Sequence, residues 1–227
     1  MSLYLWINIA TFGTLFLSFD KKVAFYKYFR ALSFAIILTW LVFIPWDVYF
    51  TNHSYWGFND QYTLGKRFLN LPVEEWLFFI TVPYSCTFIH FVLKAYFKNP
   101  FLFKKINLFW NIFGVVILLI GLYNYDQKYT FSAFVIAAIF ILIINKLDKK
   151  FMEDFLFTYI VALIPFLVVN SILTGSFTDN PVVWYSDLQN FGIRLGTIPI
   201  EDTIYNLLLL LMSTYFTHYF NLKKERK

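Results

Sequence analysis

Two pairs of adjacent acids are the residues of this sequence whose types and spacing could do chemistry. Each pair ends a motif with a glycine, an arginine and a proline at the same spacing, and each motif precedes a long apolar run. The two copies are Gly65-x-Arg67-x4-Pro72-x-Glu74-Glu75 and Gly192-x-Arg194-x4-Pro199-x-Glu201-Asp202. Burial raises the pKa of a carboxyl group, and a neighbouring carboxylate raises the pKa of one member of a pair further. Such a cluster can hold a proton for delivery, so the motifs suggest proton transfer in an apolar pocket.

The acids also fit ordinary helix-start chemistry. Proline suits the first helical position, and the positive end of a helix favours acids in its first turn. Three observations argue against that reading: the residues before the acids are apolar, adjacent acids project about 100° apart, and a helix start would accept Ser, Thr or Asn equally well. We therefore predict one proton-handling cluster, with the arginines setting the charge balance. The cluster comprises Glu74, Glu75, Glu201 and Asp202, and the arginines are Arg67 and Arg194.

The elements that must position these acids are membrane helices. The chain is 59% hydrophobic and only 15% charged, with a mean hydropathy of +0.59, which lies outside the range of soluble domains. A helix needs roughly 20 apolar residues to cross a bilayer. Seven runs qualify, at about 3 to 19, 31 to 50, 72 to 93, 107 to 123, 129 to 145, 154 to 173 and 198 to 220. We expect an all-α membrane protein with seven transmembrane helices, the first one retained and not cleaved as a signal peptide. The lone Cys86 excludes an internal disulfide and a cysteine-based metal cluster.

The basic residues predict the orientation of these helices. Four of the nineteen, Lys66, Arg67, Lys128 and Arg194, fall on one side of the predicted membrane. The other fifteen are Lys21, Lys22, Lys27, Arg30, Lys94, Lys98, Lys104, Lys105, Lys146, Lys149, Lys150, Lys223, Lys224, Arg226 and Lys227. This asymmetry predicts an integral, multi-pass protein of the cytoplasmic (inner) membrane, N-terminus out and C-terminus in. It accounts for the pI near 9.1 without a nucleic-acid partner.

The duplicated motif divides the chain into a 3+1+3 parallel repeat within one membrane domain, 1–227. The first repeat is 1–98, a linker helix occupies 99–128, and the second repeat is 129–227. The third and seventh helices then run in the same direction, so both acidic pairs lie at the outer face. Ile44-Pro45 is matched by Ile164-Pro165, but Asp47 falls opposite Leu167, and the nearby polar residue is Asn170. Asp47 is either a solvated charge at a helix end or a supporting acid that faces the bundle.

A carbocation formed beside the acids would be stabilised by aromatic faces. We expect Trp46, Trp76 and Tyr205 to provide such faces and to bind the substrate, and we expect no metal ion.

The two acidic motifs, the Ile-Pro-Trp-Asp47 end of the second helix and the Val-Asn170-Ser-Ile-Leu-Thr-Gly175 end of the sixth resemble the membrane-integral lycopene β-cyclases of the heterodimeric type. The resemblance covers the full length and is to the fused form, with both halves in one polypeptide. It implies a redox-neutral isomerisation: an acid protonates a terminal ψ-end double bond of lycopene, the neighbouring alkene attacks the tertiary cation, and loss of a ring proton gives the β-ionone ring.

The resemblance assigns acid and base work to the four motif acids and leaves open which one is the acid. It also leaves open whether one or both ends are cyclised. The flavin-dependent cyclases of the same pathway carry a dinucleotide fingerprint, and no G-x-G-x-x-G occurs here, so we expect no cofactor. The implied partners are lycopene, membrane lipid and other enzymes of the carotenoid pathway.

Three other classes of membrane protein compete with this interpretation. A seven-helix parallel-repeat transporter is the strongest rival, although the acids lie at helix starts near one face and not at a midplane break. A retinal-binding receptor would need a Schiff-base lysine in the seventh helix, and this chain has no lysine between Ile198 and Asn221. A prenyltransferase would need Asp-rich metal-binding motifs, which are not present.

Overall fold

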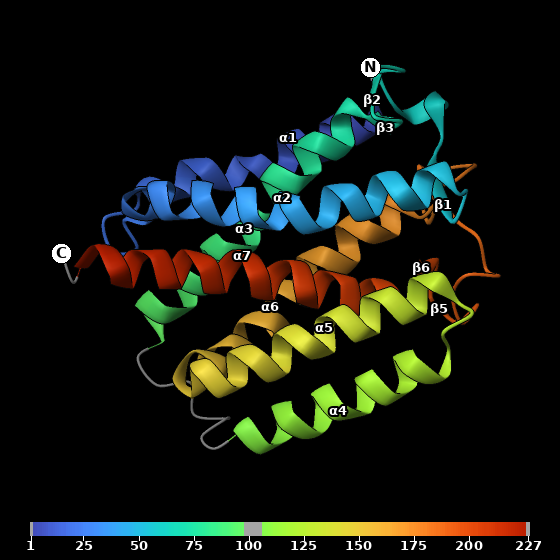
Figure 1. The fold of residues 1–227 in the computed structure, drawn as a ribbon. Coiled ribbons are helices and arrows are strands. Elements are labelled where there is room, and N and C mark those ends of the chain that lie inside the picture. Colours follow the sequence, from blue (N-terminus) through green and yellow to red (C-terminus); the bar gives the residue numbers. More distant parts are fainter. Residues whose placement is uncertain (1, 98–105, 226–227) are drawn as a thin grey trace.

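The computed structural model describes residues 2–97 and 106–225. Seven α-helices in this part of the chain lie side by side along one direction (Figure 1). Their bounds are α1 Leu3–Phe12, α2 Phe29–Asn52, α3 Val73–Tyr96, α4 Asn107–Tyr123, α5 Lys128–Leu147, α6 Lys149–Leu173 and α7 Glu201–Glu225. Each predicted apolar run coincides with one helix, and the first run continues beyond α1 as a 3-10 helix, Gly13–Phe19. The mainly helical fold predicted from the sequence is therefore confirmed.

Four helices are long and apolar enough to cross a membrane, which marks the chain as a membrane protein. They are Phe25–Asn52, Val73–Tyr96, Lys128–Leu147 and Lys149–Leu173, while Leu3–Phe19 and Asn107–Tyr123 are shorter apolar helices. Seven spans and their orientation stay predictions. Five of the basic residues on which the orientation rests lie outside the described residues, namely Lys98, Lys104, Lys105, Arg226 and Lys227, as do both sides of the predicted boundary at 98 and 99.

The helix that is least exposed to the surroundings is α7. It packs against α2, α3, α5 and α6 and runs through the middle of the bundle (Figure 1). Neighbouring helices shield it, so it can carry buried polar side chains that a lipid-facing helix would not tolerate. These side chains include Asn206, Ser213, Thr214 and Thr217, and they explain why α7 is not among the four strongly apolar helices.

Each acidic motif folds into a two-residue hairpin followed at once by a helix. In the first copy β2 (Arg67–Phe68) pairs with β3 (Leu71–Pro72), and in the second β5 (Arg194–Leu195) pairs with β6 (Ile198–Pro199). The register is the same, because the motif arginine faces the motif proline in both copies. The motif glycines, Gly65 and Gly192, have φ of +70° and +68°, a left-handed conformation that side chains disfavour. The repeated glycine is thus explained by the backbone.

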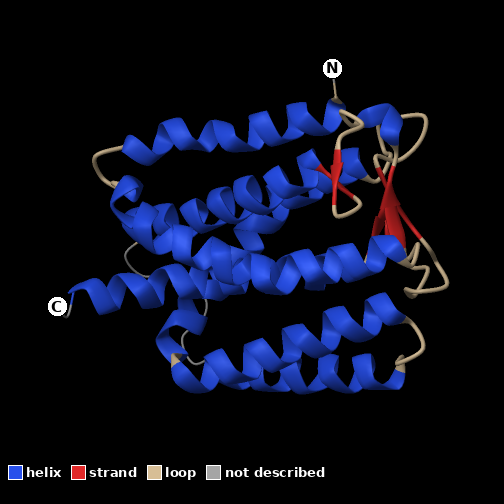
Figure 2. Cartoon of the chain, turned by 45° about the horizontal axis from the view of Figure 1, so that its top comes forward, coloured by secondary structure: helices blue, strands red, loops and turns tan. Residues whose placement is uncertain are grey.

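A third strand pair joins the two halves of the chain. Strand β1 (Trp56–Phe58), after α2, pairs antiparallel with β4 (Val183–Tyr185), after α6, and Trp56 lies opposite Tyr185. All the strands gather at one end of the bundle (Figure 2). Helices α3 and α7 both start at this end and pack side by side, so the two acidic pairs lie there together. The strands were not predicted, and the exact division of the chain into 1–98, 99–128 and 129–227 stays a prediction.

Candidate functional site

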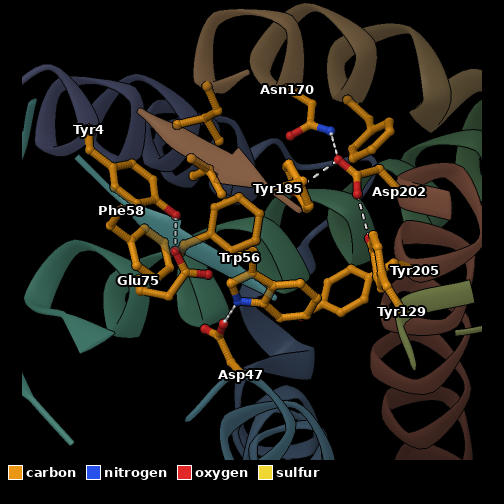
Figure 3. A pocket seen from close by; sticks show the side chains of 14 residues that line it. Tyr4, Asp47, Trp56, Phe58, Glu75, Tyr129, Asn170, Tyr185, Asp202 and Tyr205 are labelled. Carbon is orange, nitrogen blue, oxygen red and sulfur yellow. Dashed lines mark hydrogen bonds between the residues drawn. The ribbon is translucent and has the colours of Figure 1, made fainter. Parts of the chain in front are cut away.

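A cavity at the strand-bearing end of the bundle is lined by side chains from both halves of the chain (Figure 3). The empty space within it amounts to about 480 Å³, open solvent included. Ten of the lining residues are aromatic or aliphatic: Tyr4, Trp56, Phe58, Phe78, Tyr129, Phe166, Leu173, Val183, Tyr185 and Tyr205; the others are Asn170 and the three acids Asp47, Glu75 and Asp202. All three acids are at most 7% exposed.

Two of the acids form one wall of the cavity. The hydroxyl group of Tyr4, in the first turn of α1, donates a hydrogen bond to Glu75 in the first turn of α3. Asp47 of α2 lies next to Glu75 and interacts with it electrostatically. The indole Nε1 of Trp56 donates to Asp47 Oδ1 at 2.5 Å. This wall therefore holds two neighbouring carboxyl groups, each with one donor from an aromatic side chain.

The opposite wall holds a single acid with three donors. Asp202, in the first turn of α7, accepts a hydrogen bond from Tyr129 of α5. Its other oxygen accepts from Asn170 Nδ2 at 2.6 Å and from the Tyr185 hydroxyl at 3.1 Å. A carboxylate has only acceptors, and three donors directed at one carboxyl group are the partners that a carboxylate requires. Asn170, which was predicted as a supporting residue, thus contacts a predicted catalytic acid.

The two walls are related by the duplication and differ at specific positions. Tyr4 contacts Glu75 as Tyr129 contacts Asp202, and each tyrosine is the second residue of its helix. The symmetry is broken where Asp47 stands beside Glu75 and Asn170 stands beside Asp202. Two halves of one chain therefore build a single cavity with an acid pair on one side and an acid–amide pair on the other.

The first acid of each motif does not line the cavity. Glu74 is fully buried, and its Oε1 accepts a hydrogen bond from the backbone N–H of Leu64 at 2.6 Å. Glu201 is equally buried and accepts from the N–H of Phe191 at 2.8 Å and from the Thr130 hydroxyl at 2.7 Å. The expected cluster of four acids is thus divided in the structure: Glu75 and Asp202 face the cavity, whereas Glu74 and Glu201 hold the loops that precede their hairpins.

The motif arginines pair with acids in these same loops and not with the motif acids. Arg67 forms a salt bridge with Asp60 at 2.7 Å, and Arg194 forms one with Asp187 at 2.5 Å. Each arginine also donates to a carbonyl oxygen of its own hairpin turn. Their charge therefore balances loop carboxylates at the surface, and the walls of the cavity contain no arginine.

The three aromatic residues predicted to bind substrate lie at different places relative to the cavity. Tyr205 lines the cavity. Trp46 is buried behind Tyr205, with ring centroids 5.1 Å apart. Trp76 lies outside the cavity, where its Nε1 donates to the carbonyl of Phe68 at 3.3 Å. Tyr205 could thus touch a molecule in the cavity directly, whereas Trp46 could act on it only through Tyr205.

Sequence reasoning missed four side chains that hold the cavity acids: Tyr4, Trp56, Tyr129 and Tyr185. Tyr4 and Tyr129 could have been found from the sequence repeat, since each occupies the second position of the first helix of its half. Trp56 and Tyr185 come from the long loops, and only the β1–β4 pairing brings them over the cavity. Burial first, then the charge of Asp202, raises the pKa of Tyr185 well above its usual value, so its side chain is a neutral phenol. Within the described residues, no group of three His, Cys, Asp or Glu side chains could hold a metal ion.

Comparisons with known proteins relate the chain to one family. A sequence model of a family described as lycopene cyclase matches residues 1–93 and 126–220, which leaves the whole of α4 unmatched. Three fungal relatives are each named bifunctional lycopene cyclase/phytoene synthase. The protein of Leptosphaeria maculans is 29% identical over 73 residues, 32% of this chain and 12% of its own length. That of Aspergillus oryzae is 25% identical over 93 residues, 41% and 16% of the two lengths. That of Phaeosphaeria nodorum is 33% identical over 51 residues, 22% and 9%. Each match thus covers only a small part of the relative. No solved structure matches the chain.

Proposed function

The chain belongs to the lycopene cyclase family, in the fused form with both halves in one polypeptide, and from this premise we propose that it closes the ψ-ends of lycopene to β-ionone rings. The reaction is a redox-neutral isomerisation. A proton adds to the terminal double bond, the neighbouring alkene attacks the resulting cation, and a ring proton is lost. The protein therefore needs a proton donor, a proton acceptor and a shielded place for the cation.

The observation that carries this proposal is the single cavity with Glu75 and Asp202 on opposite walls. We assign proton donation to Glu75, because two adjacent carboxyl groups such as Glu75 and Asp47 hold a shared proton more readily than two negative charges. We assign proton abstraction to Asp202, because its three hydrogen-bond donors suit a carboxylate. General acid and base catalysis of this kind contributes typically about 10²- to 10⁴-fold each.

The aromatic lining suits the intermediate. The electron-rich faces of Tyr205, Phe58 and Trp56 surround the space between the acids (Figure 3), and such faces attract a positive charge. The cyclisation of one end at a time follows from the presence of both acids in one cavity. We expect no flavin cofactor, because the sequence carries no G-x-G-x-x-G fingerprint.

The membrane setting fits a lipophilic substrate. We propose that all seven helices cross the cytoplasmic membrane with the N-terminus outside, that lycopene enters from the lipid, and that neighbouring enzymes of the carotenoid pathway supply it. Single cysteines placed at Thr178 and at Lys149 test the orientation with an impermeant thiol reagent in a Cys86→Ser background. Labelling of Thr178→Cys alone in intact cells is expected, and labelling of Lys149→Cys alone would reverse the topology.

The function is tested by expression in lycopene-accumulating cells with pigment analysis. Conversion of lycopene to monocyclic or bicyclic carotenoids is expected, with loss of conversion in the cavity variant Glu75→Gln at equal membrane insertion. Persistence of unchanged lycopene beside correctly inserted wild-type protein would reject the cyclase proposal. The transporter alternative is not favoured by the family match, and it predicts that lycopene remains acyclic.

A further inference from the structure

The proposed reaction consumes no net proton. In each cycle one proton passes from Glu75 to the substrate, and one passes from the substrate to Asp202. Before the next cycle the proton on Asp202 must reach the Glu75–Asp47 pair, or else the two acids must exchange separately with water. The following inference rests on the proposed function and concerns the route of that proton.

Tyr185 lines the cavity that the two walls share. Its hydroxyl group donates to Asp202 Oδ2 at 3.1 Å. On the paired strand its direct partner is Trp56, whose indole holds Asp47 at 2.5 Å. The β1–β4 pair therefore carries two side chains that contact acids, Trp56 on one wall and Tyr185 on the other (Figure 3).

The phenol of Tyr185 is suited to pass a proton on. A tyrosine hydroxyl group donates one hydrogen bond and accepts others at the same time. After burial, the charges of Asp202, Glu75 and Asp47 all act to keep the phenol protonated. It therefore stays neutral and can gain a proton on one side while it releases its own on the other.

Two other tyrosines in the cavity are less suited to this task. Tyr129 also contacts Asp202, but it comes from α5 and not from the strand pair that reaches Asp47. Tyr205 lies near the acids of both walls, yet no hydrogen bond joins it to an acid in the described part of the chain. Of the three, Tyr185 combines a hydrogen bond to Asp202 with a strand position opposite Trp56, the residue that holds Asp47 of the other wall.

We propose that Tyr185 is a proton relay that returns the abstracted proton from Asp202 to the Glu75–Asp47 pair. Protonated Asp202 gives its proton to the Tyr185 oxygen while the phenol proton passes to the carboxylate of the pair. The exchange restores a neutral phenol, a carboxylate at Asp202 and a protonated donor. No bond of the substrate and no oxidant or reductant is involved.

The test is the isotopic content of the product. Unlabelled lycopene is supplied at rising concentration to enzyme-containing membranes in D2O, and deuterium per ring is measured by mass spectrometry. Internal return predicts less than one deuterium per ring in the wild type, falling as lycopene increases, because the next substrate captures the returned proton before it exchanges. One deuterium per ring at every concentration would reject the relay while leaving the cyclase intact.

Variants separate the relay from a structural role. Tyr185→Phe is expected to lower the rate by roughly tenfold to a hundredfold and to raise incorporation to one deuterium per ring. Tyr129→Phe removes a donor to the same Asp202, so its rate falls, but its isotope content stays at the wild-type value. A Tyr185→Phe enzyme with the wild-type isotope content would overturn the proposal. The wild-type measurement stands if Tyr185→Phe fails to fold, and absence of any cyclic product from wild-type enzyme would reject the proposed function instead.

Discussion

Glu75 and Asp202 belong to different halves of the chain and face the same cavity from opposite walls (Figure 3). Each stands at the start of a helix, and each accepts a hydrogen bond from the tyrosine at the second position of a neighbouring helix. The duplication has thus produced one shared site and not two separate sites. This relationship determines what single substitutions should do to the formation of the first and second rings.

Glu75→Gln and Asp202→Asn should each abolish both rings. Since one cavity handles every end, neither variant can retain a half-enzyme that makes a monocyclic product. We expect a fall of about a hundredfold or more in total cyclised carotenoid, measured by chromatography of pigments at equal membrane content. Asp126→Asn, at an exposed loop position, is the matched control. Accumulation of the monocyclic product in only one of the two variants would indicate separate sites.

Glu74→Gln should reduce stability more than chemistry. The amide oxygen still accepts from the N–H of Leu64, but its NH2 group occupies the place of a buried oxygen, Oε2, that has no hydrogen-bond partner in the described residues. An unsatisfied buried group costs about 1–3 kcal/mol. Thermal unfolding in detergent should show that loss, while cyclisation per folded enzyme stays within about tenfold of wild type. A Glu74→Gln enzyme that is folded but as inactive as Glu75→Gln would show that Glu74 takes part in catalysis.

Trp56→Phe should slow the reaction and leave substrate binding nearly unchanged. The substitution keeps an aromatic ring in the wall and removes only the indole donor that holds Asp47. Loss of this donor leaves a buried carboxyl oxygen without a partner, a cost of about 1–3 kcal/mol, and it disturbs the group beside Glu75. We expect kcat to fall roughly tenfold to a hundredfold with KM close to wild type. A rise in KM at constant kcat would assign Trp56 to substrate binding alone.

Arg67→Gln and Arg194→Gln should have small effects. Both salt bridges lie at the surface, where their aspartate partners are 69% and 60% exposed, and exposed pairs contribute at most about 1 kcal/mol. Unfolding temperature should change little, and cyclisation should continue at a rate similar to wild type. A complete loss of activity in inserted protein would show that these arginines influence the cavity acids after all.

The class of the protein and the existence of both acidic pairs were readable in the sequence. Hydropathy over some twenty residues is a local property, so each apolar run predicted a helix that the structure contains. The motif proline and the acids after it likewise predicted the starts of α3 and α7 within three residues. The coincidence of both acid pairs at one end followed from the number of helices between them.

Only the tertiary structure decided which acid of each pair faces the cavity. Neighbouring residues on a helix point about 100° apart, so the choice between Glu74 and Glu75 depends on the rotation of α3 against α1 and α7. That rotation is set by packing between segments far apart in the chain, as is the β1–β4 pairing that brings Trp56 and Tyr185 over the acids. The sequence by itself determined that this apolar helical protein has two pairs of carboxyl groups at one end. Long-range packing determined that one member of each pair meets the other across a single cavity.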